Sequence, residues 1–217
     1  MKTTILCIIL LAGLRFSMNL TAQESVFSTG IVNADKLPPM EIVISEERLV
    51  EAFSDYHELI TEEYTYDGAE AGTHSTFMYR DRKISDTRKL FTRYLENDLL
   101  TPGKEPTGLI EMDLVYYNRT ERFTAGSFLN VFSFGITALL GVPGKKDQTL
   151  VEVELGIFDR NGQLIKKYFA PGKKNTYHSL YARKIDEREA NLEALKKALE
   201  VINEMVMTEK EDIIRLL

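Results

Sequence analysis

The pattern that most restricts the fold is a pair of segments in which apolar and acidic residues alternate. In residues 110–116 the even positions are apolar and Glu111 and Asp113 lie between them, and residues 151–157 repeat the pattern. Successive side chains of a strand point to opposite faces of a sheet, so both segments are predicted to be strands with one buried and one solvated face. On this alternation Tyr116 belongs to the buried face of the first strand.

A turn follows the second of these segments. Residues 159–162 read Asp-Arg-Asn-Gly, and Asn and Gly tolerate the positive φ angles that tight hairpin turns require. Residues 163–170 are therefore predicted to be the returning strand of a β-hairpin.

Helices are indicated where apolar residues recur every three or four positions. Ser45 is the expected N-cap of a first helix, and Asp186 with Glu189 fits a capping box at the start of a long C-terminal one. A second capping signature at Thr208 predicts a short closing helix. The expected helices are 46–63, 85–100 and 186–207, and further strands are expected at 41–45 and 73–80.

The apolar seam of the C-terminal helix has two interpretations: packing on the chain's own sheet, which we favour, or a coiled-coil partner. Together the elements predict an α+β fold, with a mainly antiparallel sheet, helices packed on one face and a long C-terminal helix. No repeat or linker divides residues 23–217, so a single domain is expected there.

Residues 1–22 have the layout of a secretory signal peptide. Lys2 precedes the uncharged apolar run 5–14, and the small residues Thr21 and Ala22 offer a cleavage site. An uncleaved anchor is the alternative. The only cysteine, Cys7, lies inside the apolar run, away from a lipoprotein processing site. We predict export to the periplasm or cell envelope, with secretion as the alternative.

Composition then excludes several classes of function. Removing residues 1–22 takes away Lys2 and Arg15 and leaves 25 basic and 33 acidic residues, a net charge of −8. Such a balance argues against non-specific nucleic-acid binding, which depends on neutralising phosphates. The processed chain would contain no cysteine, and therefore no disulfide and no thiolate metal site.

The unusual stretch is 123–144, which is 22 residues long and carries no charge. A basic region follows it: residues 145–184 hold 9 basic and 4 acidic side chains. A membrane-spanning helix would separate strands that belong to one sheet, so we expect an amphipathic helix or helical hairpin between two strands. This insert either covers the sheet or contacts a membrane or a partner protein. The candidate contact residues are Phe128, Phe132, Ile136, Leu139, Leu140, Lys145 and Lys146.

No motif predicts a catalytic, metal or cofactor site. His57-Glu58 lacks the second histidine of a zincin helix, because residue 61 is Thr, and His74 and His178 have no metal-ligand spacing. Glu111 and Asp113 share a strand face in the way that glycosidase carboxylates can. We therefore lean toward a non-enzymatic interaction or accessory protein without cofactors. The alternatives are a hydrolase built from dispersed Asp, Glu and His residues, and a lipid or small-molecule binder with a cleft between sheet and insert.

The order of elements from 85 to 206 resembles the α+β domain of bacterial envelope lipoproteins of the TolB N-terminal-like group. The resemblance lies in the hairpin LVEVELGIFDRNGQLIKKYF and in the insert segment SFGITALLGVPG that precedes it. It implies a non-catalytic role in envelope assembly or transport. The chain departs from that group by lacking a lipobox cysteine, which leaves a lipid anchor in doubt.

Overall fold

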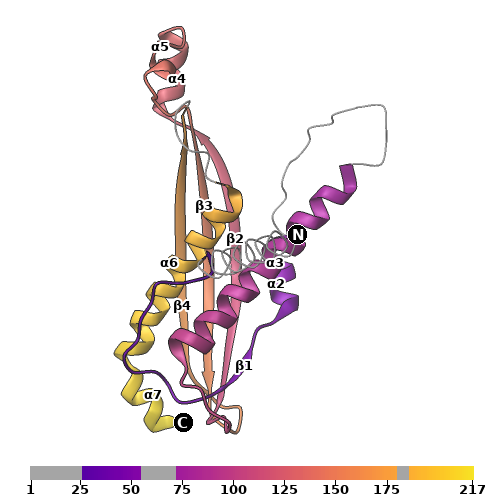
Figure 1. Ribbon diagram of the computed structural model, residues 1–217, viewed down its shortest axis with the longest axis vertical. Helices are drawn as coiled ribbons and strands as arrows, with labels where there is room; N and C mark the ends of the chain where they lie inside the picture. Colours follow the sequence, from indigo (N-terminus) through magenta and orange to yellow (C-terminus); the bar gives the residue numbers. More distant parts are fainter. Residues whose placement is uncertain (1–25, 55–71, 180–185) are drawn as a thin grey trace, which may run out of the picture.

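The computed structural model describes residues 26–54, 72–179 and 186–217, with the backbone alone over 72–80. Its centre is a four-stranded sheet in the order β1-β2-β3-β4, in which β1 runs parallel to β2 and the other neighbours are antiparallel (Figure 1). The strands are β1 (Glu41–Val43), β2 (Leu109–Phe123), β3 (Lys145–Phe158) and β4 (Leu164–His178). The helices are α2 (Glu46–Ser54), α3 (Gly72–Arg93), α4 (Ala125–Phe132), α5 (Ile136–Leu139), α6 (Glu187–Thr208) and α7 (Lys210–Leu216).

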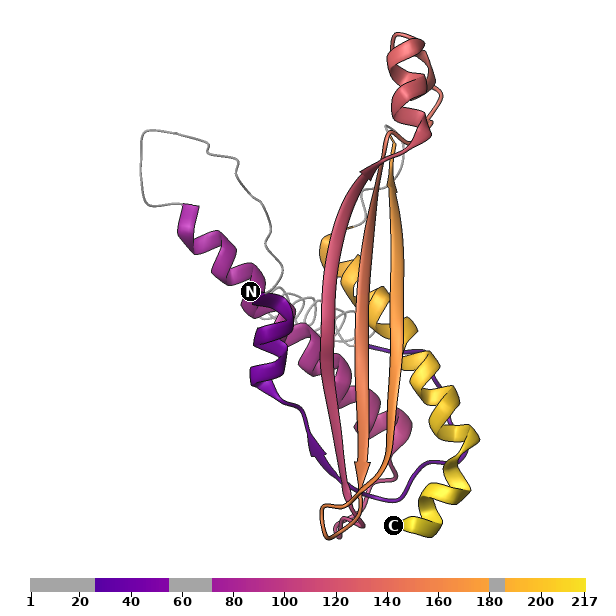
Figure 2. The same cartoon turned by 180° about the vertical axis from the view of Figure 1, so that it is seen from behind.

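Both long helices, α3 and α6, lie over the same face of the sheet, as the front and back views show (Figures 1 and 2). We call the other face the open face. The α+β class, the antiparallel sheet with helices on one face and the long C-terminal helix are thus confirmed. The apolar seam of α6 packs on this sheet, with Leu195, Leu199 and Ile202 fully or almost fully buried.

The helix-covered side of the sheet carries the core. The strand register places Met112, Leu155 and Tyr168 side by side across β2, β3 and β4, and all three are buried. The alternation seen in the sequence is therefore the pattern of a sheet whose apolar side packs against helices. The N-terminal segment joins this core where Leu37 pairs with Leu100, just after α3.

Local signals explain the ends of several elements. The Ser45 hydroxyl accepts a hydrogen bond from the Arg48 amide at 3.2 Å, as expected of the N-cap of α2. In the hairpin turn, Asp159 Oδ1 accepts from the amides of Asn161 and Gln163, and Gly162 has a φ of +79°. Asp186 does precede α6, but its side chain makes no capping hydrogen bond, so the predicted capping box is wrong in that detail.

Residues 73–80 are helical, and the predicted strand there is wrong. They begin α3, which starts 13 residues before the expected position at Ser85. The preference of Thr, Phe and Tyr for strands is weak and depends on their surroundings. No glycine or proline separates this segment from the buried part of α3, so the helix propagates through it. The helix ends as a π-helical turn over Tyr94–Leu99, in agreement with the expected end at residue 100.

A β-bulge corrects the prediction for Tyr116. Leu114 pairs with Val153 and Tyr116 with Glu152, so Val115 is an extra residue in β2. The bulge shifts the alternation by one. Tyr116 is exposed on the open face, and Tyr117 takes the buried place.

Two predicted segments fall at least partly outside the described residues. The signal segment 1–22 lies wholly outside them, and the first predicted helix, 46–63, is described only as far as Ser54.

Candidate functional site

The insert between β2 and β3 projects beyond the rest of the molecule. The three long strands continue past the helices as a narrow ribbon, and α4 and α5 stand at its end (Figures 1 and 2). We call residues 124–144 the distal tip. None of the core side chains comes from residues 118–150. The insert therefore does not cover the sheet (Figure 1), which corrects one of the two interpretations.

Hydrogen bonds close the distal tip on itself. At its base the Thr124 amide donates to the Gly144 carbonyl at 3.1 Å, and the Ser127 hydroxyl donates to the same carbonyl. Between the helices, the Thr137 hydroxyl donates to Asn130 Oδ1 and lies 3.0 Å from the Ser133 hydroxyl. The polar residues of the insert are thus used internally.

A turn in left-handed backbone separates α4 from α5. Phe134 has a φ of +51° and Gly135 one of +86°, and glycine adopts such angles without steric cost. The run is therefore a pair of short helices. No helix among the described residues is both long and apolar enough to cross a membrane.

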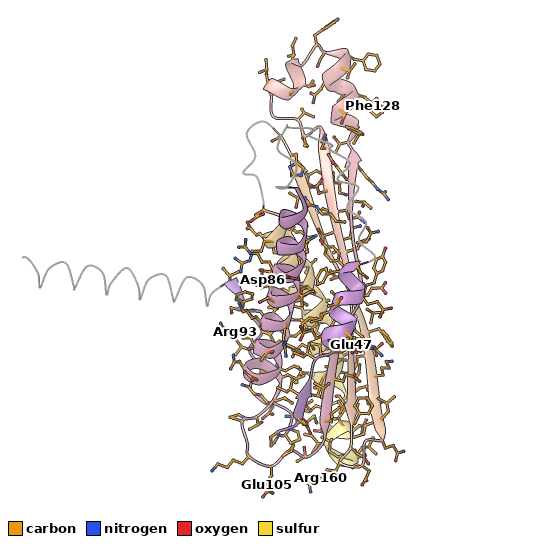
Figure 3. The ribbon with its side chains drawn as sticks, turned by 90° about the vertical axis from the view of Figure 1, so that its right-hand side faces the viewer. Glu47, Asp86, Arg93, Glu105, Phe128 and Arg160 are labelled. Carbon is orange, nitrogen blue, oxygen red and sulfur yellow. The ribbon has the colours of Figure 1, made fainter. Side chains whose placement is uncertain are left out.

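Large apolar side chains cover the outside of the distal tip. Their exposed fractions run from 53% for Leu129 to 97% for Phe134. Figure 3 shows Phe128 at this end of the molecule, far from Glu105 and Arg160 at the other. The eight exposed residues are Phe128, Leu129, Val131, Phe132, Phe134, Ile136, Leu139 and Leu140.

The structure brings the five predicted apolar contact residues together on this surface and places Lys145 and Lys146 at its base. Sequence reasoning missed Leu129, Val131 and Phe134. Its division of the run into a polar and an apolar face agrees with the structure, in which Asn130, Ser133 and Thr137 bond to one another and the apolar face is exposed. Gly135, in the middle of the uncharged run, was the available signal for a break.

Basic side chains and aromatic rings surround the base of the distal tip. Lys145 Nζ lies 5.6 Å from the centre of the Phe123 ring and 2.6 Å from Glu121 Oε1. Lys146 Nζ lies 5.4 Å from the centre of the Tyr177 ring. Amphipathic aromatics and long cationic side chains are typical of surfaces that sit at a membrane interface.

On the helix-covered face, the ribbon is joined to α6 by an ionic network. Asp147 accepts a hydrogen bond from Arg119 at 2.7 Å and lies 2.9 Å from His178 Nε2. Arg119 also contacts Glu187 at 2.6 Å, and Glu187 contacts Lys83 of α3 at the same distance. Burial alone would raise the pKa of Asp147, but the hydrogen bonds from Arg119 and His178 outweigh it and hold that pKa below its ordinary value.

The carboxylates and histidines that a hydrolase would need are only partly brought together. His178 meets Asp147 on the helix-covered face. Asp113 is buried on the open face, 2.9 Å from Arg48 Nη1, and is not the solvated partner of Glu111 that the sequence predicted. His57 and the His74 side chain lie outside the described residues. No described group of His, Cys, Asp or Glu is arranged to hold a metal ion.

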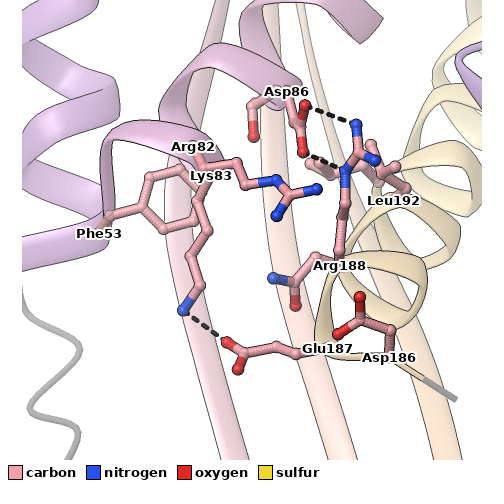
Figure 4. A pocket seen from close by; sticks show the side chains of 11 residues that line it. Phe53, Arg82, Lys83, Asp86, Asp186, Glu187, Arg188 and Leu192 are labelled. Atoms are coloured by element: carbon pink, nitrogen blue, oxygen red, sulfur yellow. Dashed lines mark hydrogen bonds and ion pairs between the residues drawn. The ribbon is translucent and has the colours of Figure 1, made fainter. Parts of the chain in front are cut away.

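A small cavity of about 50 Å³ opens between α3 and α6. Figure 4 shows its charged rim, where Arg188 donates to both oxygens of Asp86 at 2.6 and 3.0 Å and Lys83 meets Glu187. These four groups neutralise one another. The cavity is smaller than a typical ligand pocket, which has several hundred Å³ or so.

No family model matches this chain, and no curated protein does. A similar solved structure is that of a minor lipoprotein from Acinetobacter baumannii, which is 8% identical over 82% of this chain and 91% of that chain, with a TM-score of 0.31.

Proposed function

We propose that this chain is an exported, non-enzymatic envelope protein that contacts a membrane surface through its distal tip. The observation that carries the proposal is the exposed apolar surface of α4 and α5, held away from the core. Exposing eight large apolar side chains together to water is unfavourable in free energy, and such a surface marks an interaction site.

A bilayer fits this surface better than a protein groove does. The apolar side chains cover the outward sides of both helices, the polar ones are bonded to each other inside the pair, and no charge interrupts residues 123–144. Charged and aromatic side chains then begin at the base, where Lys145 and Lys146 lie against Phe123 and Tyr177. An apolar end followed by an aromatic and cationic base is the order met on passing from acyl chains to headgroups.

Liposome flotation tests the proposal. The chain without residues 1–22, which keeps every core residue, is floated with vesicles of phosphatidylcholine mixed with phosphatidylglycerol. We expect the wild type to float and a triple variant, Phe128→Ser, Phe132→Ser and Leu139→Ser, to bind about a hundredfold more weakly or worse, because three large apolar contacts are lost.

The matched control replaces three exposed apolar residues at the opposite end, Leu164, Ile214 and Leu216, with Ser. It should float like the wild type. A wild-type chain that stays with the soluble fraction would overturn the proposal, and so would a distal-tip variant that floats as well as the control.

A further inference from the structure

One row of the sheet, at the base of the distal tip, places two cations side by side on the open face. Arg122 of β2 pairs with Lys146 of β3, and Lys146 pairs with Tyr177 of β4. Directly opposite residues of neighbouring strands have their Cβ atoms only about 5 Å apart, and like charges there repel each other.

Three other cations near the distal tip have carboxylate partners. Lys145 pairs with Glu121, Arg119 with Asp147, and Lys174 with Glu193 of α6. In the part of the chain that the structure describes, neither Arg122 nor Lys146 is joined to a carboxylate. The repelling pair is therefore left for an anion from outside.

The surroundings select the kind of anion. Arg122 directly precedes the apolar run 123–144, Lys146 is the second residue after it, and the Tyr177 ring lies beneath Lys146 Nζ. The eight-residue helix α4 is about 12 Å long, and interfacial helices bury their apolar side about 5–10 Å into the acyl boundary. When α4 and α5 enter a bilayer to that depth, Arg122 and Lys146 reach the level of the lipid phosphates.

We infer that Arg122 and Lys146 form a binding site for the phosphate of an anionic phospholipid, with the Tyr177 ring flanking Lys146. The guanidinium of Arg122 offers a planar pair of donors to two phosphate oxygens, and Lys146 contributes a point charge to the same group. This inference rests on the proposed function, since it needs the distal tip at a membrane, but it adds selectivity for anionic lipid.

Flotation on two kinds of vesicle tests the site. One is phosphatidylcholine alone and the other contains phosphatidylglycerol, and the readout is the ratio of the two partition coefficients. Each basic residue near an anionic surface contributes on the order of 1 kcal/mol, so Arg122→Gln with Lys146→Gln should lower that ratio by about 30-fold. Binding to phosphatidylcholine alone should stay as in the wild type.

Two control variants separate a local site from net charge. Lys104→Gln with Arg160→Gln removes the same two charges from exposed loops at the other end of the molecule. Lys174→Gln with Glu193→Gln removes a compensated pair that joins β4 to α6. Both should keep the preference for anionic vesicles.

Each failure has its own signature. If the wild type binds both vesicles equally, or if the Lys104 and Arg160 variant loses the preference as strongly, the phosphate site is overturned and the apolar contact stands. If the wild type floats with neither, the proposed function fails and the site with it. If inorganic phosphate releases the wild type from anionic vesicles more strongly than chloride at equal ionic strength, the site takes free phosphate and the assignment to lipid is wrong.

Discussion

Asp147 and Asp113 lie on opposite faces of the same sheet, and their surroundings shift their pKa values in opposite directions. Asp147, on the helix-covered face, accepts hydrogen bonds from Arg119 and His178 that outweigh its burial and lower its pKa. Burial is the largest influence on Asp113 and raises its pKa, although Arg48 opposes the shift. Ionisation therefore favours the folded state at one site and opposes it at the other.

At neutral pH, Asp147→Asn should lower the free energy of unfolding by about 2 kcal/mol, the size typical of hydrogen bonds to a charged group. The wild-type carboxylate contributes fully above its ordinary pKa of 3.8 and loses that contribution as the pH falls through the lower folded value. Urea denaturation at neutral and acid pH should show the two proteins converging in acid. Glu121→Gln, in an exposed pair, should change stability by less than about 1 kcal/mol. A constant difference across pH would contradict the assignment.

Asp113→Asn should act in the opposite sense. Because the folded pKa is raised, wild-type stability falls as the pH rises from the ordinary value of 3.8 through the folded one, and the Asn variant escapes this loss. The variant should therefore be more stable than the wild type at neutral pH, with the advantage fading in acid. Denaturation curves at the two pH values measure the effect. A destabilised variant at neutral pH would mean that the Arg48 ion pair outweighs burial.

The close packing of α6 on β4 depends on a single glycine, Gly172. A Cβ atom added at Gly172 would collide with the Ala194 carbonyl oxygen of α6 and press on Val151. The helix backbone thus approaches the strand as closely as glycine allows, and Ala194 and Ala198 keep the helix side of the interface small as well.

Gly172→Val should therefore destabilise the fold by about 2–3 kcal/mol through overpacking. Lys173→Val places the same side chain one residue further along β4, on the open face, and should shift stability by no more than about 0.5 kcal/mol. Thermal melting followed by circular dichroism compares the two. Equal melting temperatures would show that α6 can move away from the sheet without cost.

The elements that the sequence could predict are those whose buried side repeats. Strict alternation locates residues 109–117 of β2 and 151–158 of β3, and the Asn-Gly turn locates the hairpin. Both signals depend on neighbouring residues only. The other halves of these strands, after Tyr117 in β2 and before Val151 in β3, carry mostly polar and charged residues, and no pattern in the sequence predicts them. Val115 gives no local sign of the bulge, since a bulge is defined by the partner strand.

For the candidate site, the sequence indicated composition but not position. The sequence shows the uncharged run and the lysines that follow it, and the structure places them together at the distal tip. Whether the run covers the sheet or leaves it depends on how far the strands extend past the helices, which no pattern in residues 118–123 indicates. The unpaired state of Arg122 and Lys146 is likewise a matter of cross-strand register and of the partners that neighbouring lysines take.

At the scale of the whole molecule, length and charge both favour a tip-first approach to an anionic surface. Strands rise about 3.4 Å per residue, so the end of β2 at Phe123 lies roughly 20 Å beyond the last core residue, Tyr117. The distal tip and the strand ends next to it, residues 119–147 and 173–178, carry six basic and two acidic residues, although the chain as a whole has a net charge of −6. Such an uneven distribution orients a protein in the field of a charged surface.

Contact at the distal tip and stability of the rest of the molecule should therefore be separable. Phe123 and Lys145 are directly opposite, so an Asn-Gly turn can replace residues 124–144 and close the ribbon. Because the core takes nothing from residues 118–150, the melting temperature should change by no more than about 2 °C, while flotation with anionic vesicles is lost. A large drop in melting temperature would make the distal tip part of the cooperative fold, and continued flotation would place the membrane contact elsewhere, for instance on the exposed aromatic residues of the open face such as Phe169.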